Sequence, residues 1–157
     1  MRVRSLLWFV ILLGGCAEGV QINQALYDAQ LTKEYPFARS ACFAATIKAL
    51  EDIHTPVERS ADESGMIWSK KGITFSGVNT NAAQTNAQTF TDEHRFTLRV
   101  EGNDRRCTIR TVRYETWENN KELTEVNEGA AKSLSWDPFF SAIAKNLERA
   151  KEFEQSQ

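Results

Sequence analysis

The segment 89–101 has the clearest alternation of apolar and polar residues in the chain. Charged and hydroxyl side chains separate its apolar positions, which are Phe90, Phe96, Leu98 and Val100. This period of two is typical of an antiparallel strand with one buried and one solvated face. Turn residues at 102–104 predict a hairpin to a return strand at 105–117. In that return strand the parity of the apolar positions changes, so we expect a bulge near Arg110–Thr111.

Three shorter segments precede this hairpin. Residues 56–60 and 65–70 flank a turn-rich stretch and predict a hairpin of two short strands. Residues 72–89 follow without a clear core pattern, although 73–78 could form an additional edge strand. A connection of this length is uncommon in a compact domain, and such connections are often functional or disordered.

Helical periodicity appears on both sides of the strands. We expect a first helix that has Pro36 at its first position, ends near Ile53 and stops before Pro56. Its buried side would carry Phe43, Ile47, Leu50 and Ile53. We expect a last helix capped by Asp137, with Pro138 at its first position. Its apolar stripe would be Phe140, Ile143, Leu147 and Ala150.

This order of elements predicts an α+β domain over residues 35–157: a helix, about four antiparallel strands and a helix. Because one face of the sheet reads as solvated, both helices should cover the other face. The expected architecture is therefore a two-layer sandwich.

The first fifteen residues have the organisation of a signal peptide, with two early arginines and a short apolar run at 6–13. That run is shorter than the ~20 residues needed to span a bilayer. The sequence Leu-Gly-Gly-Cys that ends at Cys16 resembles the lipobox of bacterial lipoproteins. The resemblance implies cleavage before Cys16, diacylglycerol on its sulfur and a lipidated tether over 16–34. Ordinary secretory cleavage, using Gly15 and Ala17 as a small-x-small pair, is the alternative.

The same resemblance bears on location. Ala17 stands where a signal for retention in the inner membrane would usually place aspartate. By analogy with lipoprotein sorting, we expect an outer-membrane anchor with the domain facing the periplasm. More than one acyl chain would hold such an anchor stably.

Cysteine usage and charge agree with export. Once Cys16 is lipidated, Cys42 and Cys107 remain, and we expect them to form a disulfide in an oxidising compartment; two buried free thiols are the alternative. The 19 basic residues include Arg2 and Arg4, so the processed chain would carry 17 against 21 acidic ones. This mild negative charge argues against a nucleic-acid partner.

Reactive groups are few. The two histidines, His54 and His94, have no partner at metal-ligand spacing, and no familiar catalytic motif is present. We therefore expect no metal, no cofactor and no enzymatic activity. Four arginines of the long hairpin could share its solvated face as a patch for an anionic partner: Arg95, Arg99, Arg106 and Arg110. Interleaved glutamates favour ordinary cross-strand ion pairs there instead.

A second resemblance covers about residues 36–153. The first helix, the spaced residues Val57, Asp62, Gly65 and Ile67, the long hairpin and the C-terminal helix are similar in outline to the helix-grip domains of BamC-like lipoproteins. That resemblance implies a non-enzymatic scaffold of the cell envelope.

The expected function is that of a lipid-anchored envelope lipoprotein that binds a protein partner in an envelope complex. Two alternatives stay open. One is a small envelope hydrolase that uses carboxylates near the 72–89 segment. The other is a carrier of a small apolar ligand held between the helices and the sheet.

Overall fold

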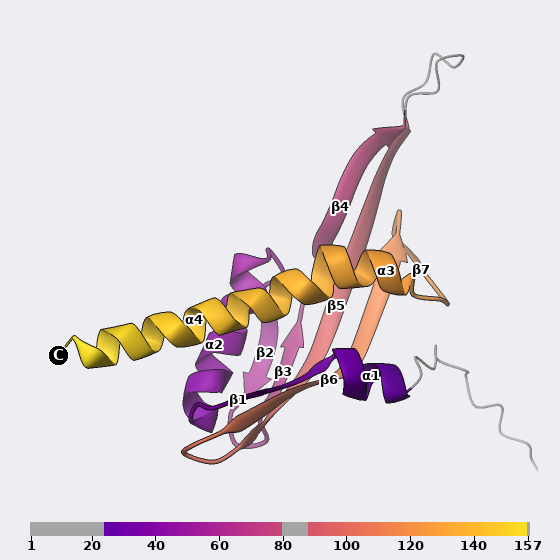
Figure 1. The fold of residues 1–157 in the computed structure, drawn as a ribbon. Coiled ribbons are helices and arrows are strands. Elements are labelled where there is room, and N and C mark those ends of the chain that lie inside the picture. The colour runs from indigo at the N-terminus through magenta and orange to yellow at the C-terminus, as the bar shows by residue number, and fades with distance from the viewer. Residues whose placement is uncertain (1–23, 80–87, 157) are drawn as a thin grey trace, which may run out of the picture.

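The structure, a computed structural model, describes residues 24–79 and 88–156. Its centre is a seven-stranded antiparallel sheet in the order β1-β6-β5-β3-β2, with β4 beside β5 and β7 beside β6 (Figure 1). The strands are β1 (Thr32–Tyr35), β2 (Val57–Ala61), β3 (Met66–Ser69), β4 (Gly72–Asn79), β5 (Gln88–Gly102), β6 (Cys107–Glu118) and β7 (Lys121–Glu122). The prediction of an α+β fold is confirmed, and the sheet is larger than the four strands expected.

The helices are α1 (Gln24–Gln30), α2 (Arg39–Asp52), α3 (Glu128–Ala131) and α4 (Asp137–Gln155). A π-helical turn, Lys132–Trp136, joins α3 to α4. Helices α2 and α4 pack side by side over one face of the sheet, and α4 runs across the strands (Figure 1). Between the two layers lies a core whose fully buried members include Leu50, Ile67, Phe96, Leu98, Ile109, Phe139 and Ile143. Apolar burial on this scale is the main favourable term in folding.

The folded part begins earlier than residue 35, so the tether predicted over 16–34 is too long. Leu31 is fully buried and Tyr27 nearly so, and both belong to the core. Their segment provides hydrogen-bond partners for backbone N–H groups of β6 that lie beyond its pairing with β1. The Thr111 N–H donates to the Leu31 carbonyl at 2.9 Å. The Tyr114 N–H donates to the Tyr27 hydroxyl at 3.1 Å. Residues 16–23 lie outside the described part of the chain.

The long hairpin of β5 and β6 follows the prediction closely, including its bulge. Thr97 faces Arg113 while the next residue, Leu98, faces Thr111, so Val112 is the extra residue. Its side chain is exposed. The bulge thus lies one position beyond the expected Arg110–Thr111. It turns Tyr114 to the core side, which keeps the apolar pattern of β6 compatible with the sheet.

The predicted start of the first helix is wrong, whereas α4 begins at Asp137, within one residue of the prediction. Helix α2 begins at Arg39 rather than at Pro36. Asp137 does not cap a helix, because helical structure already starts at α3, where the Asn127 side chain accepts from the Ala130 N–H. A proline inside a helix loses one hydrogen bond and crowds the preceding turn. Pro138 has no N–H to donate to the preceding turn, and the helix takes the π-helical form directly before it, at Lys132–Trp136.

Strand β4 confirms the edge strand considered at 73–78, and the β2–β3 hairpin is as predicted. β4 pairs with the first half of β5, whereas β3 pairs with the second half on the same side. We call β4 together with residues 88–94 of β5 the arm. The arm projects beyond the layer formed by α2 and α4 (Figure 1). Residues 80–87, the remainder of the expected 72–89 connection, lie outside the described part.

Candidate functional site

A buried histidine lies at the root of the arm, on the face covered by helices. His94 is 2% exposed and stands within hydrogen-bond distance of three hydroxyl groups. Its Nε2 lies 2.5 Å from the Thr55 hydroxyl, and its Nδ1 lies 2.7 Å from Ser135 and 2.9 Å from Thr74. Hydroxyl groups can donate or accept, so they satisfy the neutral ring in either tautomer. Burial lowers the pKa of His94 to about 4.

Local chain geometry brings Thr55 to this ring. Helix α2 ends in a Schellman motif, in which the Thr55 N–H donates to the Leu50 carbonyl at 2.8 Å and the His54 N–H donates to Glu51 at 3.0 Å. His54 takes the left-handed conformation that this motif requires, with φ of 59°. It is exposed and terminates the helix.

Ser135 and His94 form a serine–histidine hydrogen bond of the kind found between a catalytic nucleophile and its base, but their surroundings differ from those of a catalytic pair. Ser135 is fully buried, on the π-helical turn, and His94 is almost fully buried. The group on the other ring nitrogen is a threonine hydroxyl rather than a carboxylate. A substrate could not reach this serine, so the network joins the sheet to the helices without offering a catalytic site.

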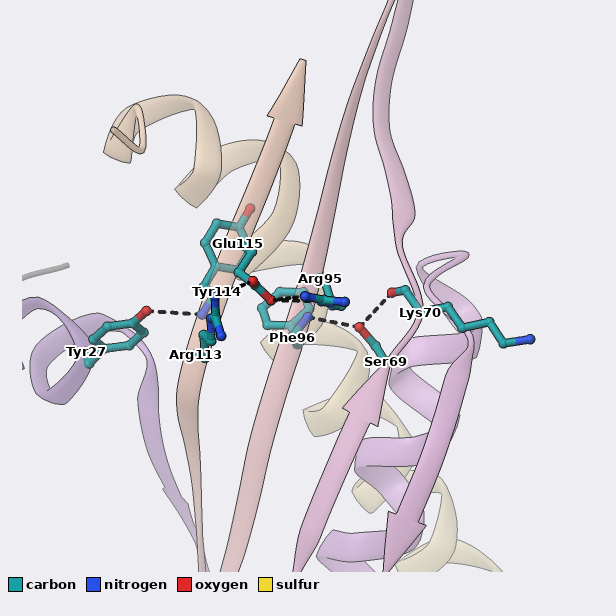
Figure 2. Close-up of polar contacts among 8 residues, drawn as sticks. All are labelled: Tyr27, Ser69, Lys70, Arg95, Phe96, Arg113, Tyr114 and Glu115. Atoms are coloured by element: carbon teal, nitrogen blue, oxygen red, sulfur yellow. Dashed lines mark hydrogen bonds and ion pairs between the residues drawn. The ribbon is translucent and has the colours of Figure 1, made fainter. Parts of the chain in front are cut away.

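The opposite, open face of the sheet carries a different polar cluster (Figure 2). Glu115 is 8% exposed and receives two arginines. Arg95 approaches one carboxylate oxygen through Nε and Nη2, both at 2.8 Å, and Arg113 approaches the other oxygen at 2.7 Å. Its hydrogen bond to Glu115 raises the pKa of Arg95. Beside this cluster, the Ser69 hydroxyl donates to the Lys70 carbonyl and accepts from the Phe96 N–H.

A shallow depression of about 320 Å³ adjoins the Glu115 cluster. The guanidinium of Arg59 lies over the Trp68 ring at 3.9 Å and forms one wall. Three arginines and two glutamates line the depression, so most of its charge is compensated within the protein. Paired and stacked side chains of this kind are ordinary on the solvated face of a sheet.

The four arginines proposed as an anionic-partner patch are not gathered into one free cluster. Arg95 pairs with Glu115, Arg99 lies 3.7 Å from Glu101, and Arg110 lies 3.9 Å from Asp28. Arg106 is exposed just before β6 begins. These are ordinary ion pairs, of which Arg95–Glu115 is the cross-strand one, and a binding role for the patch stays a prediction.

The predicted cysteine pair is present: Cys42 and Cys107 form a disulfide that links α2 to the start of β6. Both cysteines are buried in the core. The bond therefore joins the helix layer to the sheet. Cys16, the predicted lipidation site, lies outside the described residues.

The arm exposes two large apolar side chains. Ile73 is 59% exposed and Phe75 is 44% exposed, and the Phe75 ring packs on Phe90 at 5.5 Å. Gly77 makes this contact possible, because a Cβ there would stand 2.6 Å from the Phe90 ring. Close to the root of the arm, the inner face of the sheet forms a cavity with the segment 123–134.

Sequence reasoning missed the contacts of Glu115 and Thr55. Arg95 and Glu115 oppose each other only because the bulge at Val112 shifts the register by one residue. The contact of Thr55 with His94 can be recognised only after the end of α2 is known. Within residues 24–79 and 88–156, no group of three or more His, Cys, Asp or Glu side chains is arranged to hold a metal ion. No helix in that part is long and apolar enough to cross a bilayer.

Comparisons with known proteins add little. The sequence matches no protein-family model, and no curated protein matches it significantly. Among solved structures, the fold is similar to a DUF4468 family protein from Bacteroides ovatus ATCC 8483, with 11% identity and a TM-score of 0.44. The match covers 80% of this chain and 95% of that one, and a similarity this low carries no inference about function.

Proposed function

We propose that the protein is a lipid-anchored, non-enzymatic component of the cell envelope that binds an extended segment of a partner protein along strand β4. The observation that supports this most is the character of the β4 edge. Strand β4 has eight residues, Gly-Ile-Thr-Phe-Ser-Gly-Val-Asn, and none of them is charged or proline. Natural sheets usually protect an exposed edge with charges, proline, bulges or a covering segment. Of these devices β4 has a bulge, between Ile73 and Phe75.

The other outer strands are protected by charges. β1 contains Lys33 and Glu34, and β2 contains Glu58 and Arg59. β4 pairs with β5 on one side, and among the described residues no backbone hydrogen bond joins its other side to another segment. An uncharged, unpaired edge is suited to accept a strand from another protein, which is a common mode of peptide recognition.

The side chains beside this edge indicate the chemistry of the partner. Ile73 and Phe75 are exposed, and their neighbours Thr74 and Ser76 are uncharged. The β4 bulge between Ile73 and Phe75 puts these two side chains on opposite faces of the sheet, because Ile73 faces Glu93 and Phe75 faces Asp92. The partner segment that fits is therefore extended and uncharged, with apolar side chains on both of its faces. Burial of the apolar area of Ile73 and Phe75 would add to the main-chain hydrogen bonds of the added strand.

The proposed anchor, Cys16 in the outer membrane facing the periplasm, would hold the domain close to a lipid surface. Seven residues separate Cys16 from α1, and a fully extended chain of that length reaches about 25 Å. The Cys42–Cys107 disulfide is compatible with an oxidising envelope compartment. On this proposal the arm would meet partners in or near the same membrane.

We expect Ile73→Lys to weaken partner binding about tenfold, because it places a charge beside the edge and removes a contact residue. The measurement is photo-crosslinking in intact cells, with the reactive amino acid at Ser76 on β4. Val112→Lys is the matched control, because Val112 is also an exposed apolar strand residue but lies on β6. Both variants should keep the stability of the parent within about 0.5 kcal/mol, as is usual for surface substitutions.

The outcome should be one crosslinked envelope protein that fades with Ile73→Lys and persists with Val112→Lys. Equal yields from both variants, or the same crosslinked protein from a probe at Val112, would refute binding along β4.

The hydrolase alternative has one supporting observation, the pairing of Asp92 and Glu118 across β5 and β6 near the arm. Both residues line the cavity at the root of the arm. The partner-binding proposal is preferred because β4 combines an uncharged, unpaired edge with two exposed apolar side chains, Ile73 and Phe75.

A further inference from the structure

The inner face of the sheet is not fully covered by the helices. Beyond the π-helical turn, strands β4, β5 and β6 form a cavity of about 330 Å³ with α3 and the segment before it. We call this space the end cavity. Its size is at the lower end of the roughly 300–1,000 Å³ that is typical of small-molecule sites.

The wall of the end cavity is mainly apolar. The large apolar and aromatic side chains on this wall are Phe90, Tyr114, Leu123, Val126 and Leu134. Leu134 is 44% exposed although it faces this space. A concave apolar wall with a few polar groups is the usual composition of a ligand site.

The charges in the end cavity all have one sign. Asp92, Glu93 and Glu118 line it, and no lysine or arginine does. Glu93 is neutralised by Lys71 at 3.2 Å. Asp92 and Glu118 face each other directly in the β5–β6 register, and within the described residues neither has an ion-pair partner. Like charges in directly opposed cross-strand positions destabilise a sheet.

We propose that the end cavity binds a small molecule with an apolar body and one ammonium group. The apolar body packs on Phe90, Leu123 and Leu134. The ammonium lies between the carboxylates of Asp92 and Glu118 and relieves their repulsion. This proposal does not rest on partner binding along β4.

Phenethylamine is a suitable probe, and two analogues of similar shape separate the contributions. Phenethyl alcohol lacks the charge, and hydrocinnamate carries the opposite charge. By isothermal titration calorimetry on the whole processed protein, we expect the amine to bind about tenfold more tightly than the alcohol, which is about 1.4 kcal/mol. We expect no detectable binding of hydrocinnamate.

Glu118→Gln should abolish the preference for the amine over the alcohol, and Glu122→Gln should leave it unchanged. Glu122 is the matched control, because it is an exposed glutamate on β7 that does not line the end cavity. Without ligand, Glu118→Gln should raise the melting temperature, since it removes one of two opposed charges. Equal binding of amine and alcohol, binding of hydrocinnamate, no binding of any probe or a lower melting temperature for Glu118→Gln would overturn the proposal.

Discussion

Replacement of both Cys42 and Cys107 by alanine is expected to lower the free energy of unfolding by about 4 kcal/mol. The two cysteines are 65 residues apart, so the bond closes a long loop in the unfolded chain and removes much of its conformational freedom. It joins α2, which carries part of the core, to the first residue of β6. A loss of this size is a large share of the 5–15 kcal/mol, roughly, that stabilises an ordinary domain.

Urea denaturation of the oxidised protein and of the double alanine variant would measure this loss. The parent protein reduced under denaturing conditions and refolded in reductant is the control, and its stability should fall to a value near that of the variant. A loss below about 1 kcal/mol, the size of an average point substitution, would contradict the account of the disulfide.

The second large effect is a dependence of stability on pH that originates at His94. In the folded protein, burial lowers the pKa of His94 to about 4. The unfolded chain has an ordinary histidine pKa near 6.5. Above pH 6.5 neither state binds the proton, and the contribution of the neutral ring is fully present. Between pH 6.5 and 4 only the unfolded chain becomes protonated, so stability falls by about 3 kcal/mol in total.

The measurement is the free energy of unfolding at pH 7 and at pH 4.5, for the parent and for His94→Gln. Carboxylates titrate in part of this range, so the informative quantity is the difference between the two proteins. The variant should lose less stability on acidification than the parent does. His54→Asn, at the exposed end of α2, is the control and should behave as the parent. Identical pH profiles for His94→Gln and the parent would contradict the assigned role of His94.

Some parts of the fold could be predicted because neighbouring residues encode them. The β5–β6 hairpin follows from its alternation and its turn, and the bulge follows from the change of parity in β6. The disulfide could be proposed because only two cysteines remain after Cys16. Helix α2 was found through its buried stripe, although its start was not, since proline at 36 is a general rather than a specific signal.

Other parts depend on contacts that the sequence does not display. Tyr27 and Leu31 are two apolar residues in a polar, glutamine-rich stretch, and only the free edge of β6 gives them a place to pack. The pair formed by Arg95 and Glu115 depends on the position of a single bulge residue. The end cavity is formed by strands and a helix that are far apart in the chain, so no local pattern indicates it.

Both proposed binding surfaces lie at the arm end of the domain. The outer edge of β4 is proposed to bind a protein segment, and the end cavity at the root of the arm a small cation. The His94 network lies between the end cavity and the core, and it fixes the π-helical turn against the sheet. Both proposed surfaces therefore depend on the His94 network to hold the neighbouring strands and the π-helical turn in place.

Mass spectrometry of the N-terminal peptide of the protein, purified from bacterial membranes, tests the proposed lipid anchor. We expect a peptide that begins at Cys16 and carries the added mass of diacylglycerol and an amide-linked fatty acid. A peptide that begins at another residue, or one that carries an unmodified Cys16, would contradict it.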